Sequence, residues 1–221
     1  SEFPEKVLEE AERVPDAPTE SDLAGRLDLR EEITFTIDGA DAKDLDDAIS
    51  LDILDNGNYQ LGVHIADVAE YVKEDSAIDK EAYLRGNSVY LINEVIPMLP
   101  RDLSNGICSL NEGEDRLTMS LIAEVDPKGR LHDYELVEGI IRTDRRLSYP
   151  EVSDYLEDGT DHPSLDGLHE MLDHMEILSK AIRKRRQERG NINFDFDEPL
   201  ITIDEDGVPI DIQVEDRRVA N

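Results

Sequence analysis

Apolar residues alternate with polar ones along the first third of the chain, in a rhythm that predicts β-strands. Residues 33–37 are rich in β-branched and aromatic side chains, and residues 48–53 and 59–65 alternate with a period of two. The pair Asn56-Gly57 between the last two stretches is a strong signal for a β-hairpin turn. This part of the chain is therefore expected to form a strand, an acidic loop and a hairpin.

The remaining pattern mixes strands with helices. Residues 117–125 and 131–142 predict two further strands, and apolar residues at helical spacing from Leu168 to Ile182 predict a long helix that ends at Gly190. The other expected elements are helices over residues 4–13 and 75–85, a strand over 88–92 and a hairpin turning at Asp206-Gly207. The fold class that follows is α+β, with a mixed, mostly antiparallel sheet and packed helices.

The composition is strongly acidic, and this limits the partners that the chain can bind. The 221 residues carry 23 Lys and Arg against 54 Asp and Glu, which gives a formal net charge of −31. Such a surface repels nucleic acid unless positive charge is concentrated locally or supplied by metal ions or further domains. The sequence contains no apolar run as long as the ~18 residues of a membrane span and no secretory signal, so we expect no membrane partner. The lone Cys108 excludes an internal disulfide and favours a reducing, cytoplasmic setting.

The most informative segment is an acidic loop over residues 38–47, directly after the first predicted strand. Its five carboxylates are Asp38, Asp41, Asp44, Asp46 and Asp47. Mg²⁺ prefers oxygen ligands, and two such ions held about 4 Å apart can position both the attacking water and the leaving oxygen of a phosphodiester. Composition alone favours a plain acidic surface loop instead, and the spacing does not fit the EF-hand pattern.

Several other side chains have both a structural and a functional interpretation. His64, in a predicted strand beside Asp67, is expected to be a satisfied core or rim histidine, and Cys108 a small buried hydrophobe. His169 and His174 are five residues apart on the long helix, which places them on different faces, so we expect surface histidines.

The densest positive cluster lies at the end of the long helix, over residues 180–189. It is either a solvated helix face or a track for phosphates. Core packing is the default for the aromatic residues Tyr90, Tyr149 and Phe194, and base stacking is the functional alternative.

The acidic loop resembles the signature of a known family. Thr36-Ile37-Asp38, followed after five residues by Asp44-Leu45-Asp46-Asp47-Ala48, is similar to the RNB catalytic domain of the ribonuclease II/ribonuclease R family, nearest to its bacterial ribonuclease R members. Further blocks resemble the family in the expected order and cover nearly the whole chain: Ala24-Gly25-Arg26-Leu27-Asp28-Leu29-Arg30, His64-Ile65-Ala66-Asp67-Val68, Tyr71-Val72, Arg85-Gly86-Asn87-Ser88-Val89-Tyr90, Val95-Ile96-Pro97-Met98-Leu99-Pro100, Leu103-Ser104-Asn105-Gly106-Ile107-Cys108-Ser109-Leu110, Arg146-Leu147-Ser148-Tyr149 and Glu188-Arg189-Gly190-Asn191-Ile192-Asn193-Phe194.

The resemblance implies a processive 3′-to-5′ exoribonuclease that uses Mg²⁺ to hydrolyse single-stranded RNA to nucleoside 5′-monophosphates. By position, the residues that match the family's catalytic and metal-binding aspartates are Asp38, Asp44, Asp46 and Asp47, of which Asp46 is the most sensitive in the family. Tyr90 and Phe194 match aromatics that clamp the RNA near its 3′ end, and Tyr149 resembles a further nucleotide contact.

The resemblance also implies how the chain is organised. Residues 1–31 correspond to an N-terminal helix and linker, and residues 32–221 to the N-terminal part of the RNB catalytic domain. A later arginine-containing motif and the RNA-binding domains of cold-shock and OB type are absent from the sequence. We therefore expect a truncated, monomeric catalytic fragment that is weak or inactive alone.

Two rival hypotheses remain open on the sequence. The first is a non-catalytic RNA-binding or regulatory protein with a degenerate RNB domain, against which the four intact aspartates argue. The second is a generic acidic cation-binding module, against which the ordered downstream blocks argue.

Overall fold

A single large sheet organises the molecule. The computed structural model of the chain describes residues 2–92, 94–192, 198–204, 208–215 and 218–220. Its seven-stranded sheet has the order β1-β8-β7-β4-β3-β2-β9, in which β1 pairs with β8 and β2 with β9 in parallel and all other neighbours are antiparallel. The strands are β1 (Leu27–Asp28), β2 (Phe35–Asp38), β3 (Asp47–Ile53), β4 (Tyr59–Ala66), β7 (Asp115–Val125), β8 (Leu131–Arg142) and β9 (Arg145–Ser148). The expected mixed, mostly antiparallel α+β fold is confirmed.

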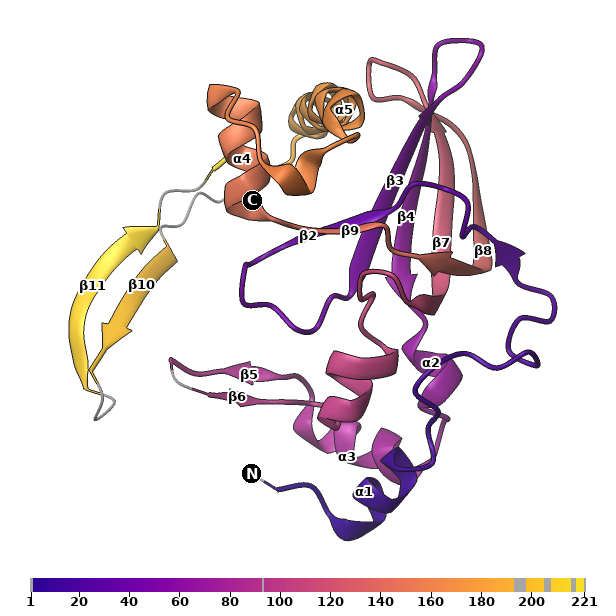
Figure 1. The fold of residues 1–221 in the computed structure, drawn as a ribbon, viewed down its shortest axis with the longest axis vertical. Helices are drawn as coiled ribbons and strands as arrows, with labels where there is room; N and C mark the ends of the chain where they lie inside the picture. Colours follow the sequence, from indigo (N-terminus) through magenta and orange to yellow (C-terminus); the bar gives the residue numbers. More distant parts are fainter. Residues whose placement is uncertain (1, 93, 193–197, 205–207, 216–217, 221) are drawn as a thin grey trace.

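Helices lie in two groups around this sheet. Figure 1 shows α1, α2 and α3 gathered below it, and α4 and α5 beside the upper part of β3. Their bounds are α1 (Glu5–Ala11), α2 (Val68–Tyr71), α3 (Ala77–Arg85), α4 (Tyr149–Asp158) and α5 (His169–Glu188), with short turns η1 (Leu103–Ile107) and η2 (Pro163–Leu165). Two hairpins stand outside the sheet: β5 (Val89–Tyr90) with β6 (Val95–Ile96), and β10 (Glu198–Ile203) with β11 (Pro209–Glu215).

One face of the sheet packs against α5. The alternating residues Leu51, Tyr59, Ala123 and Val125 project to this face and are buried together with Leu178 of α5. Burying each of the larger aliphatic side chains stabilises the fold by about 1.5–3 kcal/mol, so the apolar face of α5 matters more for its stability than its intrinsic helix propensity.

The opposite face carries a buried polar chain across three strands. Ser50 of β3, His64 of β4 and Ser120 of β7 are all buried, and the His64 ring nitrogens lie 3.1 Å from Ser50 Oγ and 2.9 Å from Ser120 Oγ. Gly62 makes room for this contact, because a Cβ there would stand 2.2 Å from Ser50 Oγ. His64 is thus a satisfied core histidine, as the sequence predicted.

A separate apolar layer forms at the other end of the molecule. Its buried members come from α1, α3 and the segment around η1, and include Val7, Ile78, Leu103 and Cys108. Burial raises the pKa of the Cys108 thiol to about 12, so this side chain behaves as the small hydrophobe that was expected.

Several elements of the structure differ from the prediction. The strand expected over residues 88–92 shrinks to the two paired residues of β5. The sequence reasoning also did not anticipate the short elements β1, α2, β6 and β9, or the helix α4. Glu151 accepts hydrogen bonds from both the backbone N–H and the hydroxyl of Ser148, at 3.0 and 2.6 Å, and this capping pair begins α4. The predicted turn Asp206-Gly207 lies outside the described residues, although the strands that flank it do pair.

Within the described ranges, no helix is long and apolar enough to cross a lipid bilayer.

Changing His64 to Gln should remove a specific pH dependence of stability. Burial lowers the His64 pKa from 6.5 to about 4, so unfolded chains take up this proton first as the pH falls. The free energy of unfolding is therefore full above pH 6.5 and declines by up to about 3 kcal/mol toward pH 4. Urea unfolding measured at several pH values across this interval gives the free energy of unfolding. As the pH is lowered, we expect this free energy to fall more steeply for the unmodified chain than for His64→Gln. Parallel curves would contradict the assignment.

Candidate active site

The four predicted aspartates lie at one end of the sheet. Asp38 is the last residue of β2, Asp47 is the first of β3, and Asp44 and Asp46 lie in the loop between them. Because β2 and β3 are antiparallel neighbours, β2 finishes and β3 begins at the same end of the sheet. The topology therefore gathers residues that the sequence spreads over ten positions.

Leu45 anchors the middle of this acidic loop. Its side chain is fully buried in a cluster with Ala48, Ala66 and Leu110. Neighbouring side chains of an extended segment point to opposite sides, so an inward Leu45 directs the two flanking carboxylates outward. Removing such a side chain typically costs about 2–5 kcal/mol, so the loop has a firm attachment despite its charge.

Hydrogen bonds to its backbone carbonyls hold the loop at both ends. The Ala66 N–H donates to the Asp46 carbonyl at 3.0 Å, and the Arg146 guanidinium of β9 donates to the carbonyls of Ala40 and Ala42 at 3.0 and 2.5 Å. These contacts come from strands on either side of the loop. The loop is therefore shaped by its neighbours rather than by its own turn chemistry.

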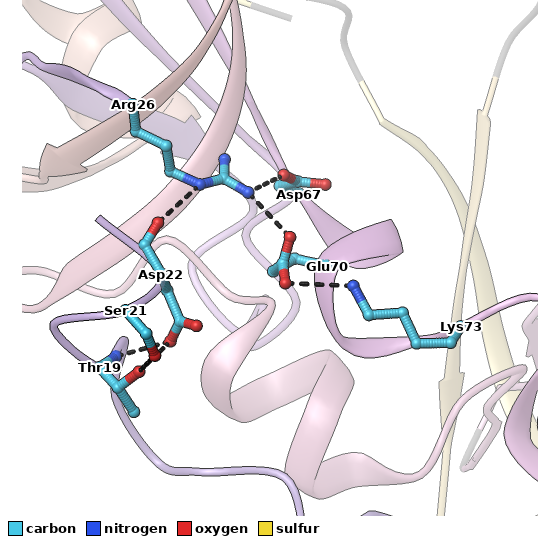
Figure 2. A network of polar contacts seen from close by, with 7 residues as sticks. All are labelled: Thr19, Ser21, Asp22, Arg26, Asp67, Glu70 and Lys73. Carbon is cyan, nitrogen blue, oxygen red and sulfur yellow. Dashed lines mark hydrogen bonds and ion pairs between the residues drawn. The ribbon is translucent and has the colours of Figure 1, made fainter. Parts of the chain in front are cut away.

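An ion-pair network centred on the buried Arg26 holds Asp67, the residue that follows Ala66. The Arg26 guanidinium lies 2.7 Å from Asp67 and 3.1 Å from Glu70. Lys73 pairs with the other carboxylate oxygen of Glu70 (Figure 2). The Arg26 side chain is only 5% exposed, and its Nε also donates to the Asp22 carbonyl. Breaking a buried pair by removing one partner typically costs ~3–5 kcal/mol, so this network ties the N-terminal segment to the end of β4.

The charges of the loop act on one another. Burial raises the pKa of Asp38, and the carboxylates of Asp47 and Asp46 raise it further, while the nearby Thr36 hydroxyl and Arg146 partly offset the rise. Asp46 keeps an exposed edge, yet partial burial and then the charges of Asp44 and Asp47 raise its pKa as well. Mutual repulsion of this kind shows that the four carboxylates share one electrostatic environment.

Tyr90 reaches this cluster from the β5–β6 hairpin. Its hydroxyl donates to Asp44 Oδ2 at 2.5 Å, and this hydrogen bond raises the pKa of Tyr90 to about 12. The residue nevertheless remains 64% exposed. An exposed aromatic ring held beside the carboxylates is placed to stack against a ligand rather than to fill the core.

The other two predicted contacts have different outcomes. Tyr149 begins α4 half-buried, and burial, together with the charges of Asp38 and Asp47, raises its pKa, so it lies near these two aspartates. Phe194 lies outside the described residues.

The residues fit a hard cation by donor chemistry. All four groups offer carboxylate oxygens, and the Asp38 Oδ2 atom is buried without a hydrogen-bond partner in the described part of the chain. In the part of the chain that the structure describes, no three His, Cys, Asp or Glu side chains lie together in a way that could hold a metal ion. The site nevertheless offers the type of donor atom that a hard cation prefers.

The basic end of α5 borders a cavity. The cavity has a volume of about 430 Å³ and lies between α5, α4 and the sheet. Its apolar wall includes Ile37, which precedes Asp38, and its basic rim consists of Lys180, Arg183 and Arg186. Part of the positive cluster thus lines a cavity beside β2, and Lys184 and Arg189 lie outside this lining. All five of these side chains are exposed to solvent.

Sequence reasoning overlooked two supporting residues. Arg146 appeared only within a family-like block, and nothing in its local pattern announces that it bonds to a loop more than a hundred residues earlier. Ser109 is fully buried and contacts the same loop. Only the folded topology brings either residue to the site.

Comparison with known proteins gives one consistent answer. The RNB domain family matches residues 26–221. The chain is 48% identical to ribonuclease R 1 of Lactococcus lactis subsp. lactis over all of this chain and 27% of that protein, and 48% identical to ribonuclease R of Thermotoga maritima over 99% of this chain and 31% of that protein. It superimposes with a TM-score of 0.92 and 34% identity on Mycoplasma genitalium RNase R in complex with ribose methylated single-stranded RNA, over 99% of this chain and 34% of that one. The chain thus spans about a third of the length of these relatives.

Replacing Asp38 by Asn should stabilise the metal-free chain. When folding raises the pKa of a carboxyl group, the folded state loses stability as the pH rises and the group ionises. At neutral pH the charged Asp38 therefore opposes folding. Asn keeps the shape without the charge, and we expect a gain of about 1 kcal/mol in chelator-treated buffer. Thermal unfolding of both chains with EDTA measures this gain. A lower melting temperature for Asp38→Asn would show that the charge is already compensated.

Proposed function

The chain belongs to the RNB domain family, and from that premise we propose that it is the site-bearing part of a 3′-to-5′ exoribonuclease that hydrolyses single-stranded RNA to nucleoside 5′-monophosphates. The observation that carries the proposal is the exposed Tyr90 ring hydrogen-bonded to Asp44, at the sheet end where Asp38, Asp46 and Asp47 meet. A stacking surface beside a carboxylate cluster is what cleavage at the last phosphodiester of a strand requires.

This proposal assigns catalytic roles to the residues at this end of the sheet. Mg²⁺, when bound by Asp38, Asp44, Asp46 and Asp47, would supply charge neutralisation of the phosphate and a more acidic water. The protein itself supplies the fixed carboxylates, whose backbone is already hydrogen-bonded in place, and the Tyr90 ring, which orients the terminal base. Stacking does not discriminate among bases, which suits degradation of any sequence.

The charge of the chain shapes its partners. At a net charge of −31, this chain alone attracts a polyanion poorly, so we propose that the RNA-binding domains of cold-shock and OB type expected in a full-length protein supply much of the affinity. The basic rim of Lys180, Arg183 and Arg186 is the local exception. Both a monomeric state and a cytoplasmic setting belong to this proposal.

A non-catalytic RNB protein is the alternative. It predicts RNA binding without Mg²⁺-dependent cleavage. All four aspartates are present at the end of the sheet, and this argues for catalysis.

Activity should depend on Mg²⁺ and on Asp46. We expect the 221-residue chain to shorten 5′-labelled single-stranded RNA slowly or not at all, and the same chain extended to the length of its relatives to shorten it progressively from the 3′ end. Asp46→Asn in the extended chain should lower the rate by about 100-fold or more, since it removes charge where a cation must be held. Gel analysis with Mg²⁺ or EDTA gives the answer. An inactive extended chain with all four aspartates would favour the non-catalytic alternative.

The two functions of Tyr90 can be separated by substitution. Tyr90→Phe keeps the ring and loses the hydrogen bond to Asp44, so RNA affinity should be retained. Tyr90→Ala loses the ring, and because stacking contributes ~1–3 kcal/mol per base, binding should weaken about 5- to 150-fold. Fluorescence anisotropy with a short labelled RNA at low salt distinguishes them. Equal affinities for both variants would remove Tyr90 from the RNA-binding surface.

A further inference from the structure

Ser109 contacts the acidic loop from beneath. It lies between η1 and β7, with its side chain fully buried. Its hydroxyl donates to the Lys43 carbonyl at 2.9 Å and accepts from the Leu45 N–H at 3.0 Å. Lys43 and Leu45 are the two neighbours of Asp44, so one hydroxyl group joins both peptide groups that flank this aspartate.

This arrangement fixes the backbone at Asp44. The carbonyl of Lys43 and the N–H of Leu45 belong to the peptide planes on either side of the Asp44 Cα atom. A single atom that bonds both planes restrains the two backbone angles between them, and these angles direct the carboxylate. Asp44 is also the residue that accepts the Tyr90 hydroxyl, so its direction affects both parts of the site.

Ser109 is itself rigidly held. Its N–H donates to the Gly106 carbonyl at 3.0 Å, and its carbonyl accepts from the buried Arg116 Nε at 2.9 Å. The next residue, Leu110, donates its N–H to the Leu45 carbonyl at 2.9 Å. The segment therefore forms a firm support under the loop rather than a mobile contact.

We propose that Ser109 is a positioning residue, which presets the direction of the Asp44 carboxylate and thereby the affinity of the aspartate cluster for Mg²⁺. This inference rests on the proposed function, since it assigns Asp44 to the cation site. A hydroxyl is needed because it donates and accepts at once, which Ala cannot do. Side chains that orient metal ligands from behind typically change metal affinity about 10- to 100-fold when removed.

Ser120 provides a matched control. It is also a fully buried serine with two side-chain hydrogen bonds, to His64 at 2.9 Å and to Thr118 at 2.9 Å. Neither partner belongs to the acidic loop. Ser120→Ala therefore reproduces the loss of a buried hydroxyl without touching Asp44.

The first measurement needs no metal. Amide hydrogen exchange by NMR should show faster exchange of the Leu45 N–H in Ser109→Ala than in the unmodified chain, by about tenfold or more. Ser120→Ala should leave the Leu45 N–H unchanged. The Cys side chain is nearly equal in size to Ser but forms only weak hydrogen bonds, so Ser109→Cys should give an intermediate exchange rate. This variant provides the test if Ser109→Ala does not fold. Unchanged protection of Leu45 in the Ser109 variants would overturn the proposal.

The second measurement tests the consequence for the cation. Titration of Mn²⁺, followed by EPR with Mg²⁺ as competitor, should show about tenfold weaker binding in Ser109→Ala and no change in Ser120→Ala. Equal affinities in the two variants, with Asp46→Asn binding weakly, would refute the role of Ser109 and leave the proposed function standing. Absence of Mn²⁺ binding to the unmodified chain, with Leu45 exchange still dependent on Ser109, would instead refute the cation site.

Discussion

Repulsion among four carboxylates is the constraint around which this structure is arranged. Asp38 and Asp46 both have raised pKa values because partial burial and neighbouring negative charges oppose their ionisation. Such a cluster does not hold itself together. It persists because contacts from outside the loop fix the backbone beneath it: the buried Leu45 side chain, the hydrogen bond from the Ala66 N–H, and those from the Arg146 guanidinium, whose positive charge also partly offsets the repulsion. The free energy for holding the loop comes from the sheet and its packing.

This division of labour explains what local sequence could reveal. The alternating strands, the Asn56-Gly57 hairpin and the long amphipathic helix are all local patterns, and β3, β4, β7, β8 and α5 formed close to where they were expected. The aspartates are also adjacent in sequence, so their joint chemistry was visible. By contrast, α4 was not predicted, although the capping pair of Ser148 and Glu151 is a local signal for a helix start.

The supporting residues could not be found in the same way. Arg146 and Ser109 lie far from the acidic loop in sequence, and their roles depend on the parallel pairing of β2 with β9 and on the path of the chain after η1. Short-range periodicity contains no information about such pairings. The placement of charge also depends on the fold. The net charge of −31 predicts repulsion of RNA, but the fold places Lys180, Arg183 and Arg186 together at one cavity near β2.

The pairing of β2 with β9 also has a consequence for biosynthesis. Asp38 of β2 stands opposite Ser148 of β9, so the two strands are far apart in order of synthesis. Contacts of such long sequence separation form slowly, because closing the intervening chain costs conformational entropy before the contact can stabilise the fold. A nascent chain that has not yet reached residue 148 carries every aspartate of the cluster but lacks the strand that contributes Arg146. The ribosome therefore completes the acidic loop well before the protein can give it its final shape.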